Sequence, residues 1–101
     1  MDSLKNHQNF RLTIMDGGKL VLADGDCIMG NMVYRFKKGL LNDVVDKEGN
    51  VYPAVESRDG NHIEHWKEGV LHCENSPAIV DNIDNYEEWY FEGNKVPSGG
   101  K

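Results

Sequence analysis

The chain has 101 residues, a formal net charge of −6, 11 glycines and two cysteines. Its length predicts a single domain with a modest core, and no apolar run approaches the ~18 residues of a membrane span. Cys27 and Cys73 lie far apart without C-x-x-C spacing, so neither a disulfide framework nor a zinc knuckle is predicted. The residues after Met1 lack an apolar signal core, and the expected location is therefore the cytoplasm.

The N-terminal third is predicted to contain short strands between residues 10 and 33. Residues 1–9 are polar and are expected to be flexible. Residues 10–14 alternate in polarity, and Asp16-Gly17-Gly18 is typical of a hairpin turn. Residues 20–23 return as a short strand that is apolar on both faces, before a second turn at residues 24–26.

The rest of the chain continues as short strands separated by turns. Strands are expected at residues 32–36, 40–45, 51–57, 62–67, 70–73, 78–80 and 86–91. Gly-Asn pairs mark turns at 30–31, 49–50, 60–61 and 93–94, and residues 98–101 are expected to be flexible. This spacing predicts an all-β domain built as an antiparallel meander. The meander is expected to curl, or to dimerise, in order to cover its apolar face.

A sequence repeat occupies residues 34–97. Residues 36–41 read F-K-K-G-L-L and residues 66–71 read W-K-E-G-V-L, while Tyr90 begins a third, truncated copy. Pro-Ala follows the first glycine after 14 residues and the second after 8 residues. A six-residue insertion around residues 46–51 therefore reconciles the two copies, as a repeat array tolerates in one loop.

The repeat has a skeleton of aromatic, glycine, leucine, histidine and proline-alanine positions. Its members are Phe36, Gly39, Pro53, Ala54, Trp66, Gly69, Leu71, His72, Pro77, Ala78, Tyr90 and Gly93. The order aromatic-x-x-Gly-x-Leu-His followed by Pro-Ala resembles the MORN-like β-repeats of bacterial and phage proteins. The first copy departs from this pattern because Asn42 stands where the family has histidine. The resemblance implies a β-repeat architecture and no single activity.

The aromatic positions of the repeat are predicted to form the core. Phe36, Trp66 and Tyr90 recur at one point in each copy, so they are expected to stack as a ladder across neighbouring strands. Ala54 and Ala78 would leave room beside these rings. Because neighbouring residues of a strand point to opposite faces, one of the aromatics at positions 89 and 90 could face solvent.

The histidines and Cys73 invite a metal or catalytic interpretation. His62 and His65 fall on opposite faces of one strand, and so do His72 and Cys73. Because convergent ligands are missing, no metal, cofactor or catalytic residue is predicted. His72 is instead expected to bond the backbone of the loop that leads to Pro77. A His/Cys metal-binding or hydrolytic domain stays an alternative.

The charge of the chain is uneven. Residues 43–92 hold 13 acidic and three basic residues, a balance of −10, which leaves +4 for the remainder. Such an acidic half disfavours nucleic acid and anionic membranes and favours a protein partner with a basic surface. A surface that merely keeps the protein soluble is the simpler interpretation.

The sequence therefore predicts a non-enzymatic protein–protein interaction module. The expected contacts are the acidic and aromatic residues Glu74, Asp84, Glu87, Glu88, Trp89 and Glu92. The phage association of the resembling repeats implies a small acidic inhibitor of a host nucleic-acid-binding defence protein, in the manner of anti-CRISPR proteins. A self-associating structural repeat protein, such as a homodimer, is the second hypothesis.

Overall fold

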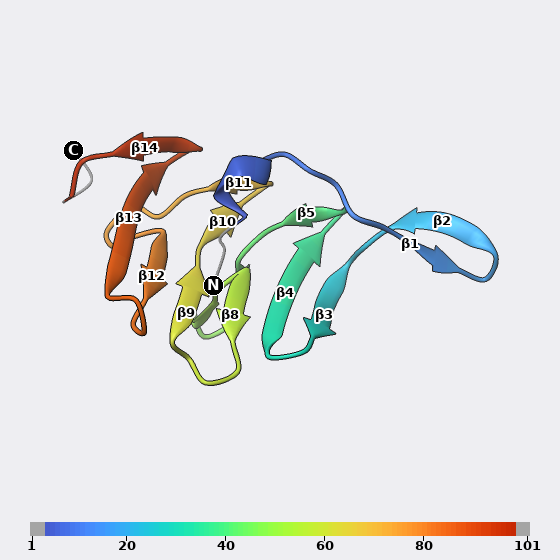
Figure 1. Cartoon of the computed structure of the whole chain (residues 1–101). Coiled ribbons are helices and arrows are strands. Elements are labelled where there is room, and N and C mark those ends of the chain that lie inside the picture. The colour runs from blue at the N-terminus through green and yellow to red at the C-terminus, as the bar shows by residue number, and fades with distance from the viewer. Residues whose placement is uncertain (1–3, 99–101) are drawn as a thin grey trace.

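The computed structural model describes residues 4–98, and strands and turns make up most of this part of the chain (Figure 1). A short 3₁₀ helix, η1 (Lys5–His7), comes first. The strands are β1 (Thr13–Asp16), β2 (Lys19–Leu22), β3 (Gly25–Met29), β4 (Met32–Lys37), β5 (Leu40–Leu41), β6 (Val44–Val45), β7 (Val51–Tyr52), β8 (Val55–Ser57), β9 (His62–Glu64), β10 (Trp66–Lys67), β11 (Val70–Leu71), β12 (Ile79–Asp81), β13 (Tyr86–Phe91) and β14 (Asn94–Val96). The predicted all-β class is confirmed.

The main sheet contains eight strands in the order β14-β13-β12-β9-β8-β4-β3, with β5 paired to β4. All its recorded pairings are antiparallel, so the predicted antiparallel meander is also confirmed. Three further hairpins, β1–β2, β6–β7 and β10–β11, complete the fold of residues 4–98. The sheet ends at β3 on one side and β14 on the other, and it is therefore open. No helix between residues 4 and 98 is long and apolar enough to cross a membrane.

The x-Gly step of the repeat forms the same hairpin turn in every copy. The two turn residues have φ values of 51° and 80° at Lys38-Gly39, 48° and 87° at Glu68-Gly69, and 47° and 87° at Glu92-Gly93. Positive φ at both positions defines the type I′ turn, whose twist matches that of the flanking strands. Gly17-Gly18, between β1 and β2, forms a fourth turn with φ values of 59° and 84°.

Successive hairpins are joined through the backbone of these turns. The amide N–H of each turn glycine donates to a carbonyl in the preceding unit: Gly39 to Ala23 at 2.7 Å, Gly69 to Leu41 at 2.9 Å and Gly93 to Leu71 at 2.8 Å. Because the donor and the acceptor belong to different copies, each turn fixes the position of the next. The sequence repeat is thus a repeat of contacts between units.

One side chain per unit also accepts a hydrogen bond from a backbone N–H in the turn of the next unit. The bonds join Asp24 Oδ1 to the N–H of Lys38 (2.8 Å), Asn42 Oδ1 to the N–H of Glu68 (2.7 Å) and His72 Nδ1 to the N–H of Glu92 (2.9 Å). Asn42 therefore fills the role of the histidine that the first copy lacks. The predicted bond from His72 to the loop before Pro77 is wrong, because the ring turns toward the following hairpin instead.

The repeat aromatics lie in one core but do not stack on each other. Phe36, Trp66 and Tyr90 are 7%, 1% and 8% exposed. The ring contacts among residues 4–98 are Phe10 edge-on to Phe36 (6.2 Å, 86°) and a tilted contact between His72 of the second copy and Phe91 of the third (4.7 Å, 52°). The predicted aromatic ladder is therefore wrong.

The spacing of the strands explains why the ladder does not form. β8 lies between β4 and β9, and β12 lies between β9 and β13. The segments that enter these two strands carry Ala54 and Ala78, which are fully buried and whose carbonyls accept from the N–H of Arg35 and His65 at 2.7 Å. Each small residue therefore stands between two successive aromatic positions, where it leaves room for the rings.

An N-terminal segment, residues 8–12, runs across the three turns of the repeat. The N–H of Leu12 donates to Gly39 O (2.8 Å) and that of Asn9 to Gly69 O (2.7 Å). The amide Nε2 of Gln8 donates to Gly93 O (3.1 Å). The predicted flexibility is therefore wrong for residues 4–9, while residues 1–3 lie outside the described residues.

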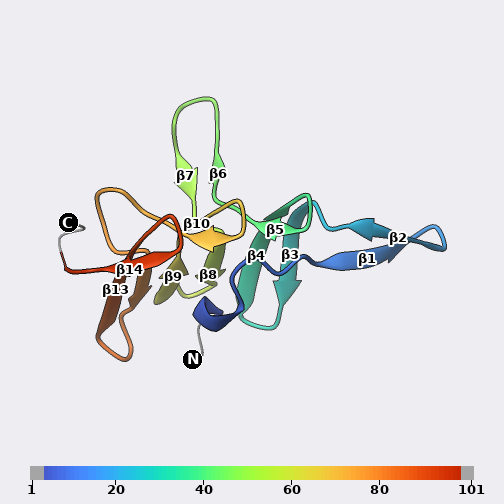
Figure 2. The ribbon, with the colours of Figure 1, turned by 90° about the horizontal axis from the view of Figure 1, so that it is seen from above.

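The copies differ in two places that the structure accounts for. The six extra residues of the first copy lie in the β6–β7 hairpin, which projects from the sheet (Figure 2). The third copy closes into a hairpin because β14 pairs with β13. Of the tail that was predicted to be flexible, Ser98 is exposed and residues 99–101 lie outside the described residues.

Candidate functional site

Strand β13 carries three of the predicted contact residues, and it alternates sharply in burial. Glu87 is exposed, Glu88 is buried, Trp89 is half-buried and Tyr90 is buried. Trp89 is therefore the more exposed of the two adjacent aromatics. The indole Nε1 of Trp89 is nevertheless buried and has no hydrogen-bond partner among the described residues.

Glu88 was predicted as a partner contact, and the structure instead places it inside the molecule. Only 4% of its side chain is exposed, and the Nζ of Lys5 lies 2.9 Å from both carboxylate oxygens. The hydroxyl of Tyr90 donates to the same carboxylate at 3.4 Å. Glu88 is thus an internal anchor for η1, and the prediction is wrong for this residue.

The environment of Glu88 favours the charged carboxylate. Burial alone would raise its pKa, but hydrogen bonds from Tyr86 and Lys5 outweigh burial and hold the pKa of Glu88 below its usual value of 4.5. The pKa of Lys5 is raised in turn, chiefly through its hydrogen bonds to Tyr86 and Glu88. The ion pair therefore fixes the N-terminal segment to β13.

The remaining predicted contacts are exposed but do not converge. Glu74 lies in the loop between β11 and β12, and Asp84 lies in the turn between β12 and β13. Glu92 lies in the turn at the other end of β13, so Asp84 and Glu92 are separated by the length of the strand (Figure 1). The predicted site is thus a dispersed set of carboxylates along one edge of the molecule.

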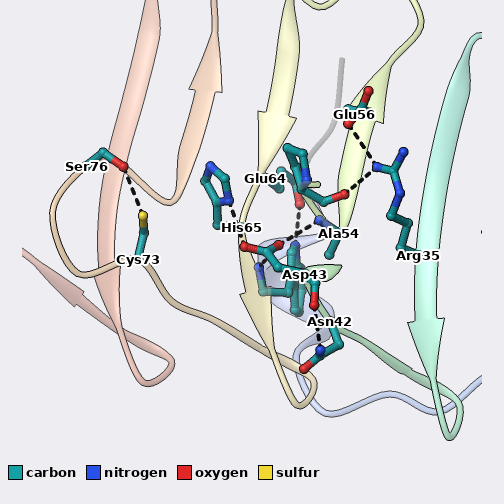
Figure 3. A network of polar contacts seen from close by, with 11 residues as sticks. Arg35, Asn42, Asp43, Ala54, Glu56, Glu64, His65, Cys73 and Ser76 are labelled. Atoms are coloured by element: carbon teal, nitrogen blue, oxygen red, sulfur yellow. Dashed lines mark hydrogen bonds and ion pairs between the residues drawn. The ribbon is translucent and has the colours of Figure 1, made fainter. Parts of the chain in front are cut away.

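Asp43 is the centre of a polar network between the first two copies (Figure 3). Its Oδ1 accepts from the backbone N–H groups of Ala54 (2.7 Å) and Trp66 (3.0 Å). Its Oδ2 lies 2.8 Å from Nδ1 of His65. A single carboxylate therefore joins the loop before β6, the segment before β8 and the strand β10.

A second network consists of buried side chains of β9 and its neighbours. The ring of His62, 3% exposed, lies between Asp81 Oδ2 (3.0 Å from Nδ1) and Glu64 Oε2 (2.7 Å from Nε2). Trp66 Nε1 donates to the other oxygen of Glu64 at 2.9 Å. The hydrogen bond to Glu64, supported by Asp81 against the cost of burial, raises the pKa of His62 above its usual 6.5.

These networks show that many carboxylates of the acidic half, residues 43–92, make hydrogen bonds within the protein. The carboxylates of this half that accept internal hydrogen bonds include Asp43, Asp46, Glu56, Asp59, Glu64, Asp81 and Glu88. Asp46 and Asp59 bind the backbone of their own loops, which is the usual role of aspartate in turns. A large part of the acidic bias therefore builds the fold, and the carboxylates left on the surface are fewer than the sequence indicates.

His72 and Cys73 take separate partners. Nδ1 of His72 accepts from the N–H of Glu92, and its ring lies against Phe91 with centroids 4.7 Å apart. The Sγ of Cys73 lies 3.0 Å from the Oγ of Ser76 (Figure 3). Within residues 4–98, no group of three or more His, Cys, Asp or Glu side chains could hold a metal ion. The histidine and the thiol are therefore used in local contacts.

The strongest candidate for an interaction surface lies outside the set of residues predicted from the sequence. The β1–β2 hairpin projects away from the main sheet in both views (Figures 1 and 2), and every residue of both strands is exposed. Its apolar side chains are Ile14 (45%), Met15 (65%), Leu20 (70%), Val21 (37%) and Leu22 (42%). Apolar residues on both faces of an uncovered hairpin are typical of an interaction site.

The β6–β7 hairpin has the same character on a smaller scale. Val44, Val45, Val51 and Tyr52 are 44%, 62%, 52% and 42% exposed. The Tyr52 ring lies 5.6 Å from the guanidinium of Arg35, which fixes the base of this hairpin. Together the two projecting hairpins hold nine of the exposed large apolar side chains of the described chain. We call these two hairpins, β1–β2 and β6–β7, the arms of the molecule.

Both arms are lengthened versions of connections that are short elsewhere in the repeat. The N–H of Ala23 donates to Leu12 O, and ten residues lie between these two positions. The equivalent pair Phe36–Leu41 encloses only four residues. The first arm thus has six additional residues, the same number as the insertion in the second arm.

Continuous apolar runs in the sequence are a signal that could have indicated these arms. Residues 20–22 are apolar without alternation, and so are the pairs 44–45 and 51–52. Such runs are typical of strands covered on both faces. In a chain of this size, few elements are available to cover them, and an external partner is one way to do so.

Comparisons with known proteins do not identify the chain, because it matches no family model, no curated protein and no solved structure. The resemblance to MORN-like repeats therefore stays a prediction. What the geometry provides on its own is a body of stacked hairpins with two apolar arms.

Proposed function

We propose that the protein is a non-enzymatic protein–protein interaction module that binds its partner through the β1–β2 arm. The observation that carries the proposal is the exposure of Leu20 (70%) and Met15 (65%), which lie directly opposite each other in the hairpin. An isolated two-stranded hairpin is marginally stable in water. A partner that buries both faces would order the arm and remove this apolar surface from water.

The partner that fits this chain has an apolar groove with a basic rim. The chain carries a net charge of −6, and the carboxylates of Glu74, Glu87 and Glu92 are on the surface. Charge of this kind steers association and selects against acidic partners more than it adds affinity. The apolar arm would therefore provide most of the binding free energy, and the carboxylates would provide selectivity.

A narrower form of the proposal is an inhibitor of a host nucleic-acid-binding protein that acts in the cytoplasm. Proteins that bind nucleic acid carry basic surfaces, which an acidic protein can occupy as a competitor. The exposed carboxylates support this form, whereas the buried Glu88 contributes nothing to it. In this form, nucleic acid and the present chain would compete for one surface of the partner.

The experiment is an affinity capture with two matched lysine variants. Leu20→Lys places a charge on the arm, and Ile83→Lys places one at an equally exposed position (73%) in the turn between β12 and β13. We expect the wild-type chain and Ile83→Lys to capture the same partner and Leu20→Lys to lose it. Washing at ~0.5 M salt tests the electrostatic component, because exposed charges are then screened.

Two results would contradict the proposal. Capture of the partner by Leu20→Lys at wild-type level would remove the arm from the interface. Loss of capture by both variants would show a general effect of added charge. Neutralising Glu87 and Glu92 without any change in capture would leave the arm intact as the interface but would eliminate the inhibitor form that depends on charge.

Self-association is the second candidate function, and the open ends of the main sheet favour it. Among the described strands, β3 pairs only with β4, and β14 pairs only with β13. Unpaired edge strands can accept a strand from another copy. A mass in solution that rises from monomer toward dimer with concentration would support this candidate, and a constant monomer mass would eliminate it.

A further inference from the structure

One cavity in the described chain has a charge opposite to that of the whole protein. It has a volume of about 630 Å³ and lies where the turn between β4 and β5 meets strand β10 and the N-terminal segment. Its charged lining consists of the cations Arg11, Lys37, Lys38 and Lys67 and the carboxylate of Glu68. Four cations and one carboxylate give this lining a balance of +3, in a chain whose net charge is −6.

The four cations of this cavity have no anionic partner within the described part of the chain. Elsewhere, Lys5, Arg35 and Lys95 each lie within 4 Å of a carboxylate oxygen. Among residues 4–98, none of the four cations that line the cavity makes such an ion pair. Glu68 offsets only one of the four positive charges of this lining. The cations therefore repel each other, and a bound anion would relieve that repulsion.

The repeat itself brings these cations together. Lys37 and Lys67 occupy the same position in neighbouring hairpins, directly after the aromatic residue and opposite Leu40 and Val70. In the third hairpin the same position is occupied by Phe91. The positive charge is therefore confined to the first two units and does not form a stripe along the whole array.

The backbone around the cavity is held in place. The N–H of Lys38 donates to Asp24 Oδ1 at 2.8 Å, and Nη1 of Arg11 donates to Lys38 O at 3.0 Å. The guanidinium of Arg11 is thus anchored by one nitrogen and keeps its other N–H groups for a ligand. A fixed turn and a tethered arginine reduce the entropy that binding would cost.

We propose that this cavity binds a small polyanion that carries two or more phosphate groups. Arginine binds phosphate in a bidentate manner and lysine binds it as a point charge. The volume is within the ~300–1,000 Å³ range of small-molecule sites. The lining includes no aromatic ring, and stacked bases of single-stranded nucleic acid require one. The site is separate from the β1–β2 arm and does not depend on the proposed function.

The test uses inorganic tripolyphosphate as the probe and titration calorimetry at low salt as the measurement. We expect saturable binding to the wild-type chain and a Kd at least about tenfold weaker after K37Q/K67Q, because this variant removes two of the four cations that line the cavity. The control K19Q/K47Q removes two exposed lysines outside the cavity and should leave the Kd unchanged. Urea unfolding of both double variants verifies that they fold.

The outcomes distinguish a specific anion-binding site from general electrostatic attraction to surface lysines. Absence of saturable binding to the wild-type chain, or equal weakening in both double variants, would overturn the proposal. Citrate provides the second arm of the experiment, since it offers carboxylates in place of phosphates. Citrate that binds as tightly as tripolyphosphate would overturn the assignment to phosphate, whereas a clearly weaker citrate Kd would support it.

Discussion

The β10–β11 hairpin and the β1–β2 arm have the same local design and opposite surroundings. In both, two paired residues enclose a four-residue turn region: Trp66 with Leu71, and Met15 with Leu20. The first pair is 1% and 0% exposed, and the second is 65% and 70% exposed. The local sequence therefore determines where a hairpin forms, while the neighbouring units determine whether its side chains are buried.

Replacing the first residue of each pair, Trp66 and Met15, with alanine should give the largest difference in the free energy of unfolding. Trp66→Ala should lower the free energy of unfolding by about 3–5 kcal/mol, because it opens a cavity in the core. It also removes the indole Nε1–H that donates a hydrogen bond to Glu64. Met15→Ala should change the free energy of unfolding by less than ~0.5 kcal/mol, because the side chain is mostly in solvent. Urea unfolding of both variants provides the measurement, and equal effects would contradict the comparison.

The turn glycines allow the same comparison with one chemical change. An alanine at Gly69 would combine a strained φ of +87° with a Cβ only 2.8 Å from Leu40 Cδ2, whereas at Gly18, with a φ of +84°, it would meet nothing within 4 Å. Strain should cost both variants ~1–2 kcal/mol. Displacing the end of the Leu40 side chain should add only about 1 kcal/mol, at Gly69 alone. Thermal unfolding would measure the difference. A Gly18→Ala variant as unstable as Gly69→Ala would show that the arm is packed after all.

His62 provides a pH-dependent contrast between the body and the arm. His62→Gln keeps a polar group but loses the positive charge between Asp81 and Glu64, and charged hydrogen bonds contribute ~1.5–3 kcal/mol. Since folding raises the pKa of His62 above its usual 6.5, its contribution is complete below pH 6.5 and is lost as the pH rises through the folded-state pKa. The difference in unfolding free energy between wild type and variant should thus shrink with rising pH.

A matched arm variant controls for general pH effects. Leu22→Gln changes an exposed side chain (42%) that the His62 network does not include. Its unfolding free energy should differ from wild type by the same amount at every pH. A His62→Gln difference that stays constant with pH would contradict the assignment of a charged imidazole.

Replacing a side chain that accepts a hydrogen bond from the next turn should have a smaller effect on the free energy of unfolding. His72→Ala removes the acceptor for the N–H of Glu92 and should cost ~0.5–1.5 kcal/mol. His72→Asn should recover part of this loss, because Asn42 makes the equivalent bond in the first copy. Urea titrations of both variants provide the measurement, and an Asn variant less stable than the Ala variant would contradict the shared role.

The smallest effect on stability is expected for Leu20→Lys, at less than ~0.5 kcal/mol. The side chain is 70% exposed, so a charge there costs little in the free chain. The same variant should abolish partner capture, which would separate the role of the arm in binding from its role in folding. A large loss of stability in this variant would indicate that the arm packs against the body in solution.

The elements that could be predicted from the sequence are those with a local cause. Each x-Gly turn forms because glycine tolerates positive φ, and Gly69 and Gly93 mark their hairpins by residue type alone. The different spacing from glycine to Pro-Ala in the two copies is likewise sufficient to predict the insertion between Gly39 and Pro53. These features depend on residues a few positions apart, so a pattern in the chain is sufficient to find them.

The elements that could not be predicted depend on distant partners. Alternation along β13 places Glu88 on the same face as the buried Tyr90. The cation that allows a carboxylate to be buried there, Lys5, lies 83 positions earlier, and no local pattern indicates it. The N-terminal segment was wrongly predicted to be flexible for the same reason, since Gln8 and Asn9 are held by the glycines of turns far along the chain. Burial of a charge and docking of a polar segment are properties of the assembled sheet.

The path of the N-terminal segment has a consequence for the order in which the chain can fold. Gln8 is made long before Gly93, yet the amide of one binds the carbonyl of the other across 85 positions. During synthesis at ~5–20 residues per second, the hairpins can form as they emerge. Leu12 and Asn9 can then bind the first two turns, while Gln8 must wait for the turn at Gly93. Contacts of such sequence separation slow folding. The last contact of the segment can therefore form only after all three x-Gly turns have been made.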